Sequence, residues 1–267
     1  MDRLKVLTLN IWNRLGPWEK RLAIIRRGLE ELSPDVVGLQ EVLSMPGFMS
    51  QVNAIAEDLG FQTVSAGDWE LGAGLTLGNA ILSKYPIAES KSFPLPTGDR
   101  EPRSLQFATL NTPLGRIPFF NTHLTHRFED GEVRMAQVKT IVERIENAAA
   151  AAEFPAVLVG DFNAAPDTNE VKTLKEKLCL IDCWQFSEAE GTVPAPGYTF
   201  SRENSFALHS DEASRRIDYI FVATASPLRA LPTRVVLAFE NPEGDIFASD
   251  HFGVYAELKL APIPAPP

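Results

Sequence analysis

The feature that most constrains the fold is an apolar run that ends in polar groups. Residues 154–163 read FPAVLVGDFN, so aliphatic and β-branched residues lead directly into Asp161 and Asn163. A run of this kind predicts a buried central strand over residues 157–159. Polar side chains that follow such a strand lie at its end, where protein scaffolds commonly hold functional groups. We therefore predict that Asp161 and Asn163 are site residues.

The rest of the chain alternates many short apolar runs with a few amphipathic segments. Helices are predicted over residues 18–32, 48–59, 130–152 and 169–177, and strands over residues 5–10, 35–41, 62–64, 71–77, 79–83, 87–93, 104–111, 116–124, 216–222, 234–239 and 252–260. Strands outnumber helices, and the two halves of the chain look alike. We therefore predict an α/β fold, a four-layer sandwich of two packed, mixed but mainly antiparallel sheets flanked by helices.

Composition sets the expected organisation. No linker rich in Gly, Ser or charge interrupts the chain, so residues 1–260 are predicted to form a single domain. Residues 261–267 are rich in proline, which blocks further ladder pairing, and are predicted to be a tail. Neither a secretory signal nor a membrane-spanning stretch is expected, which favours a cytoplasmic protein. Oligomeric state is left open, with a monomer favoured.

Charge and cysteine content argue against two classes of site. The formal net charge is -10, which opposes a protein held on nucleic acid mainly by phosphate neutralisation, although a local basic groove is compatible with it. Cys179 and Cys183 lie one helical turn apart if their segment is helical. Two thiols make neither a zinc site nor a disulfide framework, so both are predicted to be ordinary free thiols.

Polar residues directly adjoin several of the apolar runs, and strands that meet at one rim would bring them together. The set comprises Asn10, Glu41, Asn121, His123, Asp161, Asn163, Asp218, Asp250 and His251. Carboxylates gathered without lysines repel one another, so the arrangement requires a cation. Hard oxygen ligands such as Glu41, Asp250 and Asn10 suit Mg²⁺ or Mn²⁺, which also bind substrate phosphates.

Spacing predicts where some of these side chains point. Asn121 and His123 are two residues apart on a strand and face the same side. Asp250 and His251 are adjacent, so only a turn can aim both at one site. Other interpretations stay open, among them an ordinary ion pair between Asp218 and the nearby Arg216.

Six short motifs in one order are more specific than any single one. They are Thr8-Leu9-Asn10, Leu39-Gln40-Glu41, Asn121-Thr122-His123-Leu124, Gly160-Asp161-Phe162-Asn163, Arg216-Ile217-Asp218-Tyr219 and Ser249-Asp250-His251. In this order they resemble the endonuclease/exonuclease/phosphatase family, which includes DNase I-like nucleases, neutral sphingomyelinases and tyrosyl-DNA phosphodiesterases. The resemblance implies a two-sheet DNase I-like sandwich with a Mg²⁺ site at one rim.

The resemblance also implies roles for individual residues. Glu41 and Asn10 would hold the metal, with Asp250 near it. The catalytic residues would be His251, oriented by Asp218, together with Asp161, Asn163 and His123; which of Asp161 and His251 is the general base stays open. Asn163 and His123 would donate hydrogen bonds to the phosphoryl oxygens. Asn121 and Arg103 are the predicted substrate-binding residues, although a solvated loop face is an equal alternative for Arg103.

The expected function is therefore that of a Mg²⁺-dependent phosphoesterase, with Mn²⁺ as a substitute metal. A phosphodiesterase is favoured over a phosphomonoesterase, and a non-catalytic phosphate-binding module of the same fold is the alternative from another class. The expected partner is a phosphoester substrate, either nucleic acid or a phospholipid or small phosphodiester. The acidic balance argues against a non-specific DNase.

Overall fold

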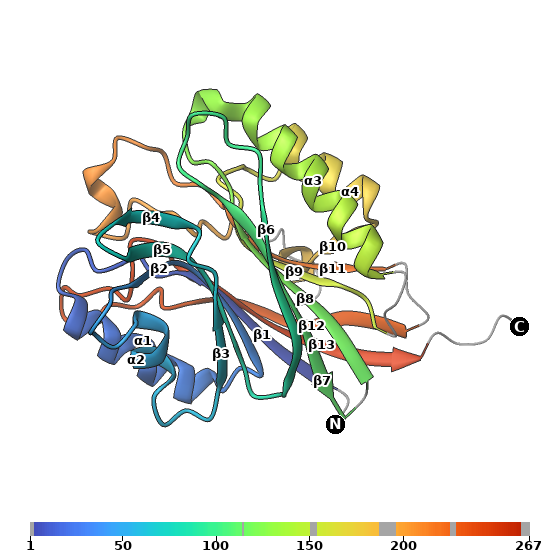
Figure 1. Cartoon of the computed structure of the whole chain (residues 1–267), viewed down its shortest axis with the longest axis horizontal. Helices are drawn as coiled ribbons and strands as arrows, with labels where there is room; N and C mark the ends of the chain where they lie inside the picture. Colours follow the sequence, from blue (N-terminus) through green and yellow to red (C-terminus); the bar gives the residue numbers. More distant parts are fainter. Residues whose placement is uncertain (1–2, 114, 150–153, 187–195, 225–227, 263–267) are drawn as a thin grey trace, which may run out of the picture.

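Two β-sheets pack face to face, and a helix layer covers each outer face, in a computed structural model that describes residues 3–113, 115–149, 154–186, 196–224 and 228–262. Figure 1 shows α1 (Trp18–Leu32) and α2 (Gln51–Ala56) on one side of the paired sheets, and α3 (Gly131–Ala149) and α4 (Asn169–Lys177) on the opposite side. The predicted four-layer α/β sandwich is confirmed. Within the described ranges no helix combines the length and the apolar character that a membrane span requires.

The first sheet has the strand order β12-β13-β1-β2-β5-β3, with β4 paired to β5. Its strands are β12 (Leu228–Ala238), β13 (Gly253–Pro262), β1 (Arg3–Asn10), β2 (Val36–Ser44), β5 (Leu75–Ser83), β3 (Gln62–Ser65) and β4 (Trp69–Gly72). The second sheet has the order β10-β11-β9-β8-β7-β6. Its strands are β10 (Leu180–Asp182), β11 (Asp218–Ala223), β9 (Val157–Asp161), β8 (Gly115–His123), β7 (Ser104–Thr112) and β6 (Ile87–Pro94). Short 3₁₀ turns are η1 (Phe128–Asp130), η2 (Cys183–Phe186) and η3 (Ala207–His209).

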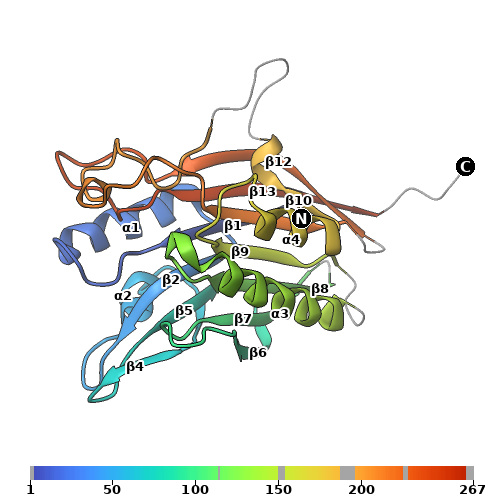
Figure 2. The ribbon, with the colours of Figure 1, turned by 90° about the horizontal axis from the view of Figure 1, so that it is seen from above.

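Each sheet contains one parallel strand pair, and the other pairs are antiparallel. β1 pairs in parallel with β2, and β8 pairs in parallel with β9. Parallel neighbours need a crossover, which α1 supplies for the first pair and α3 for the second, as can be followed from above in Figure 2. The carboxyl ends of both parallel pairs reach the same rim of the sandwich, as the contacts between their end residues show below.

Three apolar cores separate the four layers. Along β1, Leu4 and Val6 pack into the core between the sheets, whereas Leu7 and Leu9 pack against α1 and α2. The third core lies between the second sheet and the helices α3 and α4. Because side chains alternate along a strand, each strand contributes to two of these cores. The same alternation directs the polar residues at the strand ends either between the sheets or toward the helices.

Two predicted segments differ from the structure near the first sheet. The predicted helix over residues 48–59 is limited to α2, because Ser50 caps its start by accepting a hydrogen bond from the Asn53 backbone at 3.3 Å. The predicted strands 71–77 and 79–83 are also wrong in their boundary. Residues 72–74 have positive φ and make the turn, so β5 runs unbroken from residue 75 to 83 between β2 and β3.

Other boundaries differ at the ends of elements. β12 starts six residues before the predicted strand, and β13 continues to Pro262, which pairs with Leu228. The predicted helix over residues 130–152 corresponds to α3, with residues 150–153 outside the described ranges. Of the predicted tail, residues 261–262 belong to β13 and residues 263–267 lie outside the described ranges. Cys179 and Cys183 share no helix, since α4 ends at Lys177, and both are free thiols.

Gly38 controls how closely the two sheets approach. A Cβ atom at Gly38 would lie 2.4 Å from Val159 Cγ2 and 3.0 Å from Asn121 Cγ, which belong to the opposite sheet. We expect Gly38→Ala to lower the free energy of unfolding by about 1–3 kcal/mol, as overpacking does in a filled core. Urea denaturation of the purified variant measures this change.

Gly131→Ala is the matched control for this substitution. Gly131 begins α3, and a Cβ atom there would meet nothing nearer than Glu170 Oε1 at 3.7 Å. Alanine also favours the helix over glycine. If the two variants are equally stable, a Cβ atom at Gly38 is accommodated without cost, which would contradict the proposed role of Gly38 in the close approach of the sheets.

Candidate active site

The strand ends and two loops surround a cavity of about 400 Å³ at one rim of the sandwich. The predicted site residues that line it are Asn10, Glu41, Arg103, His123, Asp161, Asn163, Asp250 and His251. Asp218 lies behind His251 and contacts its ring. Asn121 is the one predicted site residue that the structure does not bring to this cavity or to a residue that lines it.

Strand register explains this convergence. In β8, β9 and β11, the residues His123, Asp161 and Asp218 are direct neighbours across the sheet. All three belong to the side of the sheet that faces the core between the sheets, because Phe119, Val159 and Ile220 of the same strands pack in that core. These polar side chains therefore lie on the same inner faces of the strands as the core residues, at the rim where the two sheets separate.

Glu41 reaches the cavity through a β-bulge. In β2 the residues Val37 and Leu39 pack toward the helices, so regular alternation would direct Glu41 to the same outer side. The register with β5 instead shifts between Leu39 and Val42, and Glu41 has a φ of 59°. Bulges of this kind redirect a side chain beside a functional site. The bulge therefore places the Glu41 carboxylate in the cavity.

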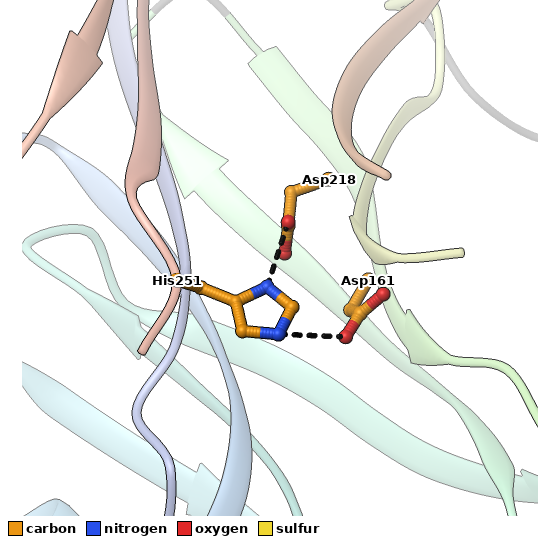
Figure 3. Close-up of side chains that lie close together, drawn as sticks. All are labelled: Asp161, Asp218 and His251. Atoms are coloured by element: carbon orange, nitrogen blue, oxygen red, sulfur yellow. Dashed lines mark hydrogen bonds and ion pairs between the residues drawn. The ribbon is translucent and has the colours of Figure 1, made fainter. Parts of the chain in front are cut away.

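His251 lies between two carboxylates, as Figure 3 shows. Its Nδ1 is 2.9 Å from Asp218 Oδ2, and its Nε2 is 3.8 Å from Asp161 Oδ2. The alternative in which Asp218 pairs with Arg216 is wrong, because Arg216 makes two hydrogen bonds to Asp182, at 2.8 and 3.2 Å. Asp218 therefore orients the His251 ring so that Nε2 faces Asp161.

Burial and neighbouring charge determine the protonation of this group. Burial alone would lower the pKa of His251, but the Asp218 and Asp161 carboxylates outweigh it and raise the pKa well above its ordinary value. Burial, together with the Asp218 charge, raises the pKa of Asp161 to about 7. These neighbours therefore favour the imidazolium form of His251 and the protonated form of Asp161.

Asp161 is held by donors from three segments. Asn10 Nδ2 donates to Asp161 Oδ2 at 3.1 Å, and the Asn163 backbone N–H donates to Asp161 Oδ1 at 2.9 Å. His123 Nε2 lies 3.4 Å from Asp161 Oδ2. Asn163, with a φ of 49°, also donates from Nδ2 to the Leu124 carbonyl at 3.0 Å, which leaves one of its amide hydrogens for the cavity.

Arg103 determines which nitrogen of His123 carries the proton. Arg103 Nη1 is 3.5 Å from His123 Nδ1, and an arginine can only donate, so Nδ1 accepts and Nε2 holds the hydrogen. Burial lowers the pKa of His123 well below its ordinary value, and the Arg103 charge lowers it further. His123 is therefore a neutral ring whose N–H points to Asp161.

Asn121 has a structural contact in place of the predicted substrate contact. Its side chain is fully buried, and Nδ2 donates to the Leu39 and Ala80 carbonyls of the opposite sheet, both at 2.9 Å. Its Oδ1 accepts from Gln40 Nε2 at 2.7 Å. With these groups already paired, Asn121 joins the two sheets directly below the cavity, and we no longer assign it to substrate.

Comparison with known proteins identifies the family. The sequence profile described as the Endonuclease/Exonuclease/phosphatase family matches residues 7–251. The chain belongs to the endonuclease/exonuclease/phosphatase family. Membership confirms the predicted class of enzyme, a metal-dependent phosphoric ester hydrolase.

Several proteins are similar to this family member over most of its length. Nocturnin of Xenopus laevis is 24% identical over 268 residues, which cover 93% of this chain and 66% of nocturnin. A putative neutral sphingomyelinase of Caenorhabditis elegans is 24% identical over 301 residues, which cover 97% of this chain and 67% of that protein. The chain thus spans about two thirds of the length of these curated relatives. The human nocturnin catalytic domain, solved with a bound sulfate anion, has a TM-score of 0.76 at 19% identity, with 97% of this chain and 95% of that chain covered.

The oxygen-rich side of the cavity suits a hard divalent cation. Glu41, Asp250 and the Asn10 amide line it together, and burial with the Glu41 charge raises the pKa of Asp250 to about 6. That raised pKa comes mainly from burial, with the Glu41 charge adding to it, and a bound cation would favour the ionised carboxylate. Asp161, Asp218 and His251 form another compact group, with ligand atoms within 4.8 Å of one another. In that group, however, the His251 Nδ1 atom is already hydrogen-bonded to Asp218.

Several residues of the cavity carry no sequence motif that singles them out. Asn13 Nδ2 donates to Glu41 Oε2 at 3.0 Å, and Trp69, Glu101 and Arg215 also line the cavity. Each comes from a loop or a short edge strand, where periodicity gives no signal. Only the proximity of Asn13 to the Thr8-Leu9-Asn10 motif offered a clue in the sequence.

Arg21 of α1 stabilises the loops that carry two predicted metal ligands. It is fully buried and donates to the carbonyls of Ile11, Trp12, Asn13, Leu15 and Ala248, at 2.7 to 3.3 Å. The segment after Asn10 and the segment before Asp250 are thus attached to one guanidinium. Burial lowers the pKa of Arg21 to about 10, against the raising effect of Asp250 and Glu41.

We expect Arg21→Met to lower the free energy of unfolding by about 3–5 kcal/mol, because the buried Ile11 and Ala248 carbonyls lose their guanidinium donor and the loop after Asn10 loses its anchor. Lys20→Met, at an exposed position of the same helix, is the matched control and should change stability little. Chemical denaturation followed by circular dichroism measures both. A small effect of Arg21→Met would mean that water replaces the guanidinium in this network.

Metal binding by this family member should weaken in acid. The raised pKa of Asp250, about 6, means that this predicted ligand is protonated below that pH and must lose the proton when a cation binds. We expect the Mn²⁺ affinity to fall roughly fourfold between about pH 8 and about pH 5.5, with proton release on binding. Calorimetry in two buffers of different ionisation enthalpy tests this, and an affinity independent of pH would contradict it.

Proposed function

We propose that this chain is a Mg²⁺-dependent phosphodiesterase that hydrolyses a phosphodiester by attack of water. The observation that carries the proposal is the contact of His251 with Asp218 on one side and Asp161 on the other, within the cavity that Glu41 and Asp250 line. A proton acceptor, a proton donor and oxygen ligands for a cation are therefore present around one volume. This combination is what phosphoester hydrolysis requires.

We assign the metal to Glu41, Asn10 and Asp250. A bound Mg²⁺ would polarise the phosphoryl oxygen and stabilise the leaving alkoxide. Asn13 orients Glu41 through the hydrogen bond to Oε2, and Arg21 holds the loops on either side of the ligand set. The support for Mg²⁺ over a softer metal is the carboxylate oxygens of Glu41 and Asp250. Asn10 would join them through its Oδ1 atom, which accepts from the Trp12 backbone N–H at 3.0 Å.

Asp161 is our choice for the general base. Its pKa of about 7 matches the range in which a carboxylate accepts a proton from water at neutral pH. His251, whose pKa is raised by Asp218 and Asp161, is charged and donates to the phosphate from Nε2. Asp218 keeps the Nδ1 proton in place throughout. The two residues thus divide the acid and base roles that the sequence left open.

Neutral donors and Arg103 complete the phosphate site. His123 presents its Nε2–H, and Asn163 has a free amide hydrogen, so both can donate to the phosphoryl oxygens as negative charge develops. Arg103 lines the same cavity, where the Glu41 and Asp161 carboxylates favour its positive charge and burial opposes it. We propose that it pairs with a phosphoryl oxygen while it fixes the His123 ring.

The walls of the cavity support a diester as substrate. Trp69 and Leu77 line it near Glu41, whereas Phe200 lies against His251, with ring centroids 5.2 Å apart. Apolar surface on both sides of the phosphate site offers a contact for each of the two ester groups. The relative named as a putative neutral sphingomyelinase suggests sphingomyelin, a lipid diester, and the family description suggests nucleic acid as the first substrates to screen.

We expect the protein to hydrolyse bis(p-nitrophenyl) phosphate with Mg²⁺ or Mn²⁺, and to lose this activity in EDTA. His251→Gln and Asp218→Asn should each lower kcat by about 10²–10⁴-fold, because the phosphate loses its charged donor or that donor loses its orientation. Release of p-nitrophenol measures both effects. Asp167→Asn is the control, since Asp167 is exposed beside α4 and lies outside the cavity lining.

The contrary outcomes point to different functions. Faster turnover of p-nitrophenyl phosphate than of the diester would favour a phosphomonoesterase. Binding of metal and inorganic phosphate without turnover of any phosphoester would favour a phosphate-binding module. Full activity of His251→Gln would remove the proposed mechanism while leaving the family assignment intact.

A further inference from the structure

We propose that the outer face of the second sheet carries a separate binding site for a small organic anion with a flat, apolar body. A cavity of about 290 Å³ lies there between the last turns of α3 and the strands β6, β7 and β8. It shares no lining residue with the active-site cavity. Its size matches the lower end of the range for small-molecule pockets.

Aromatic side chains form the floor of this second cavity. Lys91 of β6 is registered with Phe107 of β7, which is registered with Phe120 of β8, so one row across the sheet places two phenylalanine rings side by side, 5.0 Å apart. Phe93 lies on the same face of β6, and both buried rings belong to the core below α3 and α4. The cavity is therefore the end of an apolar core that the helix layer leaves uncovered.

Positive charge surrounds this floor, although the chain as a whole has a formal net charge of -10. Lys91, Arg116 and Arg144 line the cavity, and the only acidic lining residue is Glu89, which pairs with Lys91. The Arg144 guanidinium lies over the Phe93 ring, 4.7 Å from its centroid. Within the described part of the chain, Arg144 makes no ion pair, so its charge is available to a ligand.

These features specify the chemistry of the ligand. A flat apolar body can pack on the phenylalanine floor, and a carboxylate, sulfonate or phosphate can meet the guanidinium of Arg144. A neutral apolar molecule would make no ion pair with Arg144, and a simple inorganic ion would not cover the rings. The site therefore selects a compound that has both parts.

The probe for this site is anilinonaphthalene sulfonate, a flat aromatic anion that fluoresces when it leaves water. We expect saturable binding to the intact, metal-loaded protein, weakened roughly tenfold by Arg144→Glu, as reversal of one contacting charge does. Thr109→Trp should abolish binding by filling the cavity, because Thr109 lies half-buried in its lining. Both variants should keep the phosphodiesterase activity of the native protein.

Lys139→Glu is the matched control. It makes the same charge reversal on an exposed position of α3 that does not line the cavity. Equal weakening by Lys139→Glu and Arg144→Glu would reduce the effect to overall charge and overturn the proposal. Binding that survives Thr109→Trp would also overturn it, since the probe would then sit elsewhere.

Competition identifies the natural source of the ligand. Displacement of the probe by adenosine monophosphate would indicate a nucleotide, whereas displacement by 1-naphthoate would indicate an aromatic carboxylate. Failure of both compounds to displace the probe would contradict a site for flat organic anions. If the native protein shows no phosphodiesterase activity, the proposed function fails, but the probe-binding test of this second cavity is unaffected.

Discussion

The gathering of carboxylates at one rim is the constraint on which the rest of the structure depends. Asp161, Asp218, Asp250 and Glu41 lie close together there, and burial together with a neighbouring carboxylate raises the pKa values of Asp161 and Asp250. The protein offsets this cost locally with donors from Asn10, Asn13 and the Asn163 backbone, and with the charge of His251. A divalent cation bound to the proposed ligands would supply the remaining compensation. The raised pKa values that result from this crowding are what would let these carboxyl groups exchange protons and bind a cation.

The sandwich makes this arrangement rigid by bonding the two sheets together immediately below it. Asn121 and Gln40 are fully buried and link the sheets through hydrogen bonds to each other and to the backbone. Gly38 lets the sheets approach closely enough for these bonds to form. Arg21 links the loops outside the sheets, because it donates to carbonyls of the segment after Asn10 and of the segment before Asp250. Buried polar residues outside the cavity thus determine where the proposed metal ligands and substrate contacts lie.

Much of the fold could be predicted because burial leaves a direct record in the chain. The helices over residues 18–32 and 169–177 match α1 and α4, and the central run over residues 157–159 lies within β9. Turn positions were harder, since several glycines in residues 67–78 could each have ended a strand. Only pairing with β2 and β3 shows that β5 continues through Gly78.

The sequence by itself determined the layers, the family and the polar residues at the strand ends, because each of these depends on local composition and order. Tertiary structure decided what those residues do. Asn121 and His123 have the same spacing and face, yet one joins the sheets and the other lines the cavity, because the sheets part between them. Glu41 enters the site only through a bulge, and the cavity beside α3 exists only because that helix, β6, β7 and β8 meet around it. Such outcomes depend on contacts between distant segments, which periodicity along one strand cannot encode.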